Sequence, residues 1–250
     1  MFLYNMSENN YFKFSNMVLI APLVGVIAIW SVYWLELILE TNFNVFGVFP
    51  RSWIGLRGIV LSPFIHGSLE HLYNNTIPLV ILMASLFYFY KNVAIRVLVY
   101  GILLSGLVTW IIGRPSYHIG ASGLIYVLAS FIFFKGVFTK YYRLVALSLM
   151  VVFVYGSLLW YIFPIKDGIS WEGHLGGFLT GMLLSFIIKA RTPLPKKFVW
   201  ERDDYKEEED PFLKHFDENG NFIEFSENNS EEPNTSIEVN YHYKKDGPEK

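Results

Sequence analysis

Cysteine is absent from this 250-residue chain, and only six acidic residues occur before position 201. Without cysteine there is no disulfide framework, no thiol nucleophile and no zinc–thiolate site. Three candidate ligands, His66, His71 and His174, lack a carboxylate cluster at ligand spacing, so we expect no metal and no other cofactor. A phosphate-binding loop and a basic–aromatic nucleic-acid-binding pattern are also missing. No secretory signal peptide is evident, because the first apolar run is too long and lacks a small-residue cleavage pattern.

Hydrophobic residues make up 53% of the chain, and aromatic residues make up 18%. Soluble domains are typically about 45–50% apolar. The formal net charge of −2 conceals two unlike parts. Residues 1–200 hold 14 Lys and Arg against 6 Asp and Glu, a balance of +8, while residues 201–250 carry −10. The chain is therefore expected to have an apolar, basic body and an acidic, solvated tail.

Six apolar runs approach the roughly 20 residues that a membrane-spanning helix needs. We expect an all-α polytopic membrane protein with spans near residues 17–40, 69–90, 93–113, 120–135, 142–164 and 171–190. The fourth run would cover only ~23 Å of a hydrocarbon layer about 30 Å thick, so this short central helix should begin inside the protein. The expected division is a cytoplasmic segment 1–16, a six-helix membrane domain 17–191 and a mostly disordered acidic tail 192–250.

Basic residues orient the spans, because cytoplasmic loops carry an excess of Lys and Arg. With both termini in the cytoplasm, ten basic residues of the body lie inside and four lie outside, namely Arg51, Arg57, Arg114 and Lys166. We therefore expect cytoplasmic termini and a location in a bacterial inner (plasma) membrane. The connection 41–64 mixes large apolar side chains with Arg51 and Arg57, which fits a segment lying in the membrane interface or an ordinary packed external loop.

Ser122 is the first candidate for chemistry, at the start of the fourth run between Gly120 and Gly123. Near a helix N-terminus, free N–H groups and the helix dipole favour developing negative charge. The two glycines would let a substrate backbone approach closely. Small residues in this pattern also pack membrane helices together, and that alternative stays open.

Depth links Ser122 to two other polar residues. A helix rises ~1.5 Å per residue, so the basic residue at the cytoplasmic end of each run serves as a ruler. Measured in this way, Ser122, His174 and Asn75 lie ~20, ~22 and ~24 Å above those residues. Three runs thus carry polar groups at nearly one depth, which favours a single shared site.

His174 is the candidate general base for Ser122. Gly177 and Gly181 follow it on the same helix face, where a GxxxG pair permits close helix contact. If that contact is with the Ser122 helix, the imidazole meets the hydroxyl. No Asp or Glu is well placed as a third member, since Glu172 faces away. The alternative is an interfacial histidine near the end of a helix.

His71 and Asn75 are spaced i and i+4, so both point the same way. Two donors aimed at one point suit the oxyanion of a tetrahedral intermediate, although hydrogen bonds between helices would explain them equally. Tyr126 lies one turn after Ser122, where it could orient the His174 ring or simply fill the core.

The chain resembles the rhomboid family of intramembrane serine proteases over about residues 17–191. Three motifs occur in the family's order. They are Gly120-Ala121-Ser122-Gly123 for GxSG, His174-x-x-Gly177-x-x-x-Gly181 for HxxGxxxG, and His66-x-x-x-x-His71-x-x-x-Asn75 for HxxxxHxxxN. Two departures are Gly173, where the family usually has alanine, and the lack of a clear Trp-Arg pair in the first external loop, where Arg57 stands nearest to the arginine.

The resemblance implies a serine endopeptidase with Ser122 as nucleophile and His174 as general base. It implies an oxyanion hole of His71, Asn75 and the Ser122 backbone N–H, with Tyr126 stacked near His174. The partners would be the lipid bilayer and single-span membrane proteins, cut near the membrane surface at small residues and entering between the second and fifth spans.

Two other functions are weighed against this one. An inactive rhomboid-like protein that binds client helices would commonly lack the serine or the histidine, and this chain has both. A transporter or channel that uses intramembrane histidines is the other alternative. An internal repeat of one half of the chain would support it, and the sequence has no such repeat. The sequence assigns no oligomeric state.

Overall fold

The computed structural model describes residues 13–139, 141–165, 168–190, 198–217 and 219–223. Over these residues the chain forms seven α-helices joined by turns and short 3-10 helices, with no strand beyond isolated bridges. It divides into two compact units, residues 1–195 and 196–250, which are described separately.

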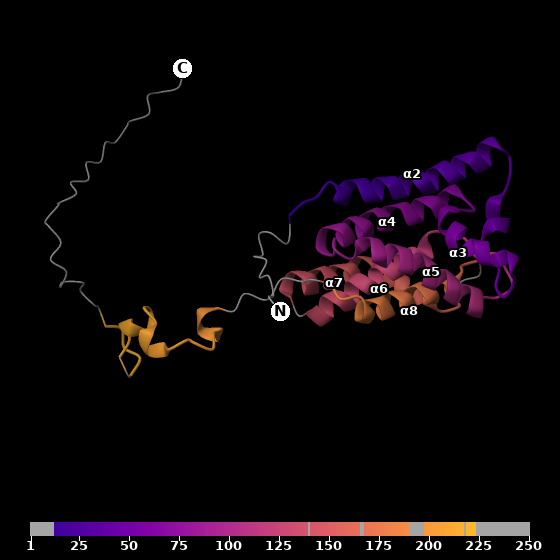
Figure 1. Ribbon diagram of the computed structural model, residues 1–250. Coiled ribbons are helices and arrows are strands. Elements are labelled where there is room, and N and C mark those ends of the chain that lie inside the picture. Colours follow the sequence, from indigo (N-terminus) through magenta and orange to yellow (C-terminus); the bar gives the residue numbers. More distant parts are fainter. Residues whose placement is uncertain (1–12, 140, 166–167, 191–197, 218, 224–250) are drawn as a thin grey trace, which may run out of the picture. The chain divides into compact units, whose positions relative to one another are not determined.

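The first unit holds all seven α-helices (Figure 1), and the expected spans agree with the six long ones to within a few residues at most ends. The helices are α2 (Met17–Ile38), α3 (Gly58–Leu61), α4 (Leu69–Phe89), α5 (Ala94–Ile112), α6 (Ser122–Thr139), α7 (Tyr142–Tyr155) and α8 (Trp171–Ile187).

Four of these helices, α2, α4, α5 and α6, are long and apolar enough to cross a membrane. The protein is therefore an integral membrane protein with an all-helical fold. Helices α7 and α8 have 14 and 17 residues, so the count of six spans stays a prediction. The fourth helix differs from its expected range, because α6 has 18 residues and continues to Thr139. It is longer than α7 or α8, and the description of it as short is not confirmed.

Helix α6 lies against α4, α5, α7 and α8. Half of its most apolar window is buried inside the protein, compared with 17% for α2, which packs against α4. Its fully buried side chains include Val127, Leu128, Phe131 and Ile132. Tyr126 and Ser130, on the opposite side of the helix, are buried as well, as expected for a helix enclosed by others.

Side-chain caps fix where the two histidine-bearing helices begin. Ser68 caps α4 by accepting a hydrogen bond from the His71 N–H at 3.1 Å. Ser170 caps α8 by accepting one from the Gly173 N–H at 3.3 Å. Serine is favoured at this position because its hydroxyl oxygen satisfies an N–H group that has no partner within the helix. His71 and His174 are thus both held in a first helical turn.

The fifth expected span, 142–164, is not one continuous α-helix. Helix α7 ends at Tyr155, and a 3-10 helix, η4 (Gly156–Ile162), follows it. Glycine destabilises a helix interior, which fits the change at Gly156. The turn carries Tyr161 toward the start of α8, against which η4 packs.

The connection from α2 to α4 is a folded loop with four short helices: η1 (Phe43–Phe46), η2 (Ile54–Arg57), α3 and η3 (Ser62–Phe64). Arg57 donates to the Val45 carbonyl at 2.9 Å and lies 4.5 Å above the Phe46 ring. Val48 forms an antiparallel bridge with His118. The loop is therefore tied both to itself and to the segment that leads into α6.

In the second unit the described residues form three 3-10 turns, η5 (Val199–Glu201), η6 (Glu207–Glu209) and η7 (Leu213–His215), and a bridge between Phe216 and Phe222. Residues 1–12, 191–197, 218 and 224–250, which include most of the expected N-terminal segment and much of the tail, lie outside the described residues. The disorder expected of the tail stays a prediction.

Candidate active site

Ser122 is the first residue of α6. The chain enters the helix through Gly120, whose φ of +103° lies in the region that favours glycine. The Gly120 N–H donates to the Ser62 carbonyl at 2.9 Å, and the Ala121 N–H donates to His66 Nε2 at 3.3 Å. The turn before Ser122 is thus fixed from the loop and from His66. N–H groups of the first helical turn have no partner within the helix, so this end of α6 suits a negatively charged atom.

His66 performs this support as a neutral imidazole. Its Nδ1 lies 3.4 Å from the Phe64 carbonyl, which can only accept, so the ring proton lies on Nδ1 and Nε2 is the acceptor for Ala121. Burial, together with the neighbouring His71 ring, lowers the pKa of His66 from 6.5 to about 4. The residue thus holds the turn before Ser122.

His174 lies beside Ser122, with Nε2 at 2.9 Å from the Ser122 Oγ. Its other ring nitrogen, Nδ1, lies 3.0 Å from the Tyr161 carbonyl. A carbonyl oxygen accepts only, so Nδ1 carries the proton and Nε2 is left to accept the hydroxyl proton of Ser122. The backbone of η4 therefore orients the His174 imidazole, as a carboxylate orients the histidine of a three-residue triad.

Tyr126 covers the His174 ring. The two rings are stacked, with centroids 4.4 Å apart and planes inclined by 17°. Tyr126 is buried and lies one turn after Ser122 on α6. The imidazole is thus held by a hydrogen bond at its edge and by a ring against its face.

Gly177 and Gly181 allow α8 to lie directly on α6. A β-carbon built at Gly177 would overlap the Gly123 carbonyl, and one at Gly181 would overlap the Val127 carbonyl and the Ser130 hydroxyl. At Gly123 itself a β-carbon would meet the Gly173 carbonyl at 3.5 Å, an ordinary contact. The helices are therefore in closest contact from Gly177 and Gly123 to Gly181 and Val127, and are less tightly packed at Gly173, before His174.

His71 and Asn75 flank the same turn from α4. A β-carbon at Gly120 would lie 2.6 Å from His71 Nε2 and 3.8 Å from Asn75 Nδ2, so both side chains face the turn before Ser122. Asn75 is buried and donates one amide hydrogen to the His71 carbonyl at 2.8 Å. An amide group has two hydrogens, so the second remains for another acceptor.

Residues 53–191 of the chain match the Rhomboid domain family. The chain belongs to the rhomboid family. Its relatives include an uncharacterized protein of Mycobacterium tuberculosis, 35% identical over 164 residues that make up 60% of this chain and 66% of the relative. An uncharacterized protein of Mycobacterium leprae is 32% identical over 146 residues, 54% of this chain and 57% of the relative. The chain thus spans less than two thirds of the length of either relative.

Beside the nucleophile candidate of this rhomboid is a small cavity of about 30 Å³ with a partly polar lining. Ser105, Thr109, His118, Ser122 and Ser170 line it, together with apolar residues such as Ile59 and Leu124. A cavity of ~10–15 Å³ of probe volume already holds one water molecule when polar partners surround it. The rhomboid fold thus has room for water next to Ser122. Among the described residues, no three His, Asp or Glu side chains are grouped closely enough to hold a metal ion.

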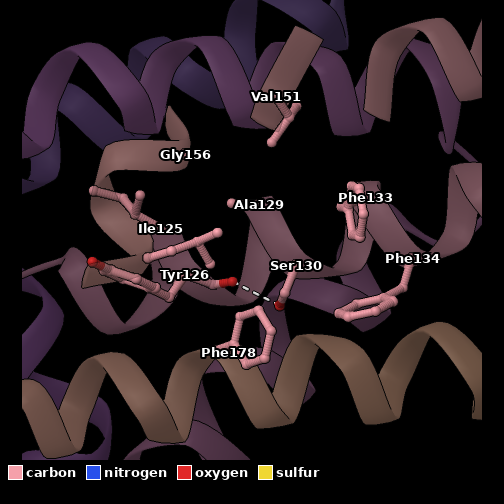
Figure 2. Close-up of a pocket in the computed structure, with 10 residues that line it drawn as sticks. Ile125, Tyr126, Ala129, Ser130, Phe133, Phe134, Val151, Gly156 and Phe178 are labelled. Atoms are coloured by element: carbon pink, nitrogen blue, oxygen red, sulfur yellow. Dashed lines mark hydrogen bonds between the residues drawn. The ribbon is translucent and has the colours of Figure 1, made fainter. Parts of the chain in front are cut away.

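A larger, apolar pocket of about 220 Å³, lined in part by Tyr126, lies between α6, α8 and the junction of α7 with η4. Figure 2 shows Ile125, Ala129 and Phe133 from α6 facing Val151 across it, with Phe178 of α8 closing one side. The Ser130 hydroxyl donates to the Tyr126 carbonyl at 2.8 Å. The pocket therefore presents an almost wholly apolar lining.

Two features of the rhomboid site have no counterpart in the sequence reasoning. The Tyr161 carbonyl carries no signal in the residue type, because every residue has a carbonyl. His118 and Ser170 were not recognised, although a histidine four residues before Ser122 and a serine four before His174 were visible in the sequence. Their hydrogen bond joins segments 52 positions apart, which no local pattern encodes.

Proposed function

We propose that this protein is an intramembrane serine endopeptidase that cleaves membrane-spanning substrates near the membrane surface with a Ser122–His174 dyad. The observation that carries the proposal is the 2.9 Å contact of His174 Nε2 with Ser122 Oγ, made while Nδ1 donates to Tyr161. This arrangement leaves the basic nitrogen facing the hydroxyl. Family membership supports the same chemistry.

In the first half of the reaction, Ser122 Oγ attacks the carbonyl carbon of the scissile peptide and its proton passes to His174 Nε2. The carbonyl oxygen becomes an oxyanion, for which His71, Asn75 and the Ser122 N–H are the proposed donors. When the intermediate collapses, the C–N bond breaks and His174 returns the proton to the leaving amine nitrogen. The substrate carbonyl remains as an ester on Ser122.

In the second half, a water molecule gives a proton to His174 and attacks the ester carbon. Collapse of the second intermediate breaks the bond to Ser122, whose oxygen recovers the proton from His174. The partly polar cavity of about 30 Å³ beside Ser122 supports this step, because hydrolysis at membrane depth needs a place for water.

The proposal includes the topology in which this chemistry would operate. We infer six spans formed by α2, α4, α5, α6, α7 and α8, both termini in the cytoplasm, and a bacterial inner membrane. The mycobacterial relatives and the excess of basic residues at the cytoplasmic ends support this placement. Residues 192–250 would form a cytoplasmic tail. Single-span proteins with small residues at the cut are the proposed substrates, and the apolar pocket beside Tyr126 suits an apolar side chain of such a substrate.

The test is cleavage of a single-span test protein co-reconstituted with the full chain in liposomes. We expect two fragments with the wild type, none with Ser122→Ala, and none with His174→Gln, while all three proteins unfold at similar temperatures. Cleavage that persists in Ser122→Ala refutes the assignment. Stable co-purification of the uncleaved substrate with the wild type would instead indicate a client-binding protein.

A further inference from the structure

A polar cluster lies at the outer ends of the two segments that carry Ser122 and His174. Arg114 and His118 belong to the segment that follows α5 and leads into α6, and Ser170 and Glu172 belong to the start of α8. We call these four residues the Arg114–Glu172 clamp. None of the four is among the residues to which the proposed mechanism gives a chemical step.

Glu172 makes the first link between the segments. Its side chain is only 1% exposed, and Oε1 accepts a hydrogen bond from the Arg114 N–H at 3.1 Å. Among the described residues no group donates a hydrogen bond to Oε2, and its charge is balanced by Arg114 Nη1 at 3.8 Å. A buried carboxylate is stable only when it is paired, so Glu172 holds Arg114 in place.

Arg114 adds a second link by donating from Nη2 to the Ile169 carbonyl at 2.6 Å. The guanidinium thus contacts both a backbone carbonyl before the cap of α8 and a carboxylate in its first turn. Guanidinium groups present several donors in a fixed plane, which suits them to hold two acceptors at once.

Ser170 and His118 make the third link, at 2.6 Å between Oγ and Nδ1. His118 Nε2 lies 3.1 Å from the Arg114 carbonyl, so Nε2 carries the proton and Nδ1 accepts the Ser170 hydroxyl proton. The same Ser170 oxygen accepts the Gly173 N–H as the cap of α8. The cap that begins the His174 helix is therefore bonded to the segment that precedes Ser122.

Helix packing restrains one side of the dyad only. From Gly177, which lies on the Gly123 carbonyl, to Gly181 the two helices are in direct contact, whereas toward the start of α8 a β-carbon at Gly123 would meet the Gly173 carbonyl at an ordinary 3.5 Å. Without another link the N-terminal ends of α6 and α8 could separate while the helices stay in contact at Gly177 and Gly181. The clamp lies at those outer ends.

We propose that the Arg114–Glu172 clamp is a positioning device that sets the distance between Ser122 Oγ and His174 Nε2. The proposal rests on the proposed dyad. Glu172 and Arg114 act through the ends of α8 and α6 and not on the substrate, so their loss lowers kcat and leaves KM nearly unchanged. A displacement of about 1 Å between reacting groups lowers a rate by up to roughly 10²-fold.

The test compares full-length wild type with Glu172→Gln, Glu172→Ala, Arg114→Met and the double variant Arg114→Met/Glu172→Ala. For each we measure kcat and KM for a single-span test substrate, the rate of Ser122 labelling by a fluorophosphonate, and thermal unfolding. We expect kcat to fall by roughly 10²-fold in Glu172→Ala and by about tenfold in Glu172→Gln, which keeps an acceptor for the Arg114 N–H. In the double variant kcat falls by less than the product of the two single losses, because both changes remove the same Arg114 Nη1–Glu172 Oε2 ion pair.

Arg51→Met is the matched control. Arg51 is also an exposed loop arginine that donates from Nη1 to a distant carbonyl, that of Ile111 at 3.1 Å, and this carbonyl belongs to α5 rather than to α8. We expect wild-type kcat from this variant. The proposal is overturned if Glu172→Gln, the variant closest in shape, keeps wild-type kcat, or if each loss of activity only follows the folded fraction. Absence of Ser122-dependent labelling in the wild type would instead refute the dyad itself.

Discussion

Replacing Gly177 with alanine tests whether close contact of α8 with α6 holds the dyad together. A β-carbon at this position would lie 2.9 Å from the Tyr126 β-carbon and would overlap the Gly123 carbonyl. Carbon atoms in contact are about 3.5–4.0 Å apart, so α8 has to move away from α6 by roughly 1 Å. Both contacts involve backbone or Cβ atoms, which have no rotamer by which to move aside.

The consequence at the site follows from the same displacement. Adding roughly 1 Å to the 2.9 Å between Ser122 Oγ and His174 Nε2 exceeds the range of a hydrogen bond. We expect kcat to fall by about 10²-fold. Overpacking destabilises a protein by about 1–3 kcal/mol, so the variant should remain folded at moderate temperature.

The assay is cleavage of a single-span test substrate in liposomes, with thermal unfolding recorded for the same preparation. Gly176→Ala is the matched control, because that glycine is adjacent but faces α5, where a β-carbon would meet the Ser105 carbonyl at 3.1 Å and Thr109 Oγ1 at 3.3 Å. A shift of a few tenths of an ångström relieves those contacts, so we expect a much smaller loss of activity. A folded Gly177→Ala variant with wild-type kcat would refute the reasoning.

Three further predictions concern other parts of the site. Asn75→Ala should lower kcat by about 10²–10³-fold with little change in KM, as expected for one lost oxyanion donor, and steady-state cleavage measures it. His66 has a folded pKa of about 4, below its ordinary 6.5, so the unfolded chain binds its proton first and stability is lost as pH falls from about 6.5 to 4; thermal unfolding against pH should show a loss of roughly 3 kcal/mol that His66→Gln lacks. Lys135→Met should lower the free energy of unfolding by about 2 kcal/mol with no change in the activity of folded protein, because Lys135 Nζ bonds the Ser185 and Ile188 carbonyls at 2.9 and 2.8 Å. The second prediction is contradicted if the wild type and His66→Gln lose stability equally as the pH falls. The third is contradicted if Lys135→Met has the free energy of unfolding of the wild type.

Much of the membrane domain could be predicted from the sequence because apolar runs mark long helices directly. Helices α2, α4 and α5 end within two residues of their expected ranges. The exceptions have local causes. Helix α7 gives way to a 3-10 helix at Gly156, and α6 continues past Lys135, whose ammonium group reaches the carbonyls at the end of α8 instead of marking the end of its own helix.

The site could be predicted in part, since depth and helix phase depend only on spacing along one helix. Ser122, His174, His71 and Asn75 fall on helices whose phase the sequence fixes, and the structure brings all four to the turn at Gly120 or beside it. The groups that orient these side chains could not be predicted from the sequence. The Tyr161 carbonyl depends on where a 3-10 helix runs, and the pairing of Arg114 with Glu172 joins positions 58 apart.

Covalent labelling of Ser122 tests the central claim most directly. A fluorophosphonate reacts when an activated serine oxygen attacks its phosphorus and fluoride leaves, so labelling reports the activated hydroxyl without requiring a known substrate. Peptide mapping of the labelled wild-type protein should find the adduct on Ser122, with none in Ser122→Ala and little in His174→Gln. An adduct on another residue, or equal labelling of all three proteins, would contradict the account.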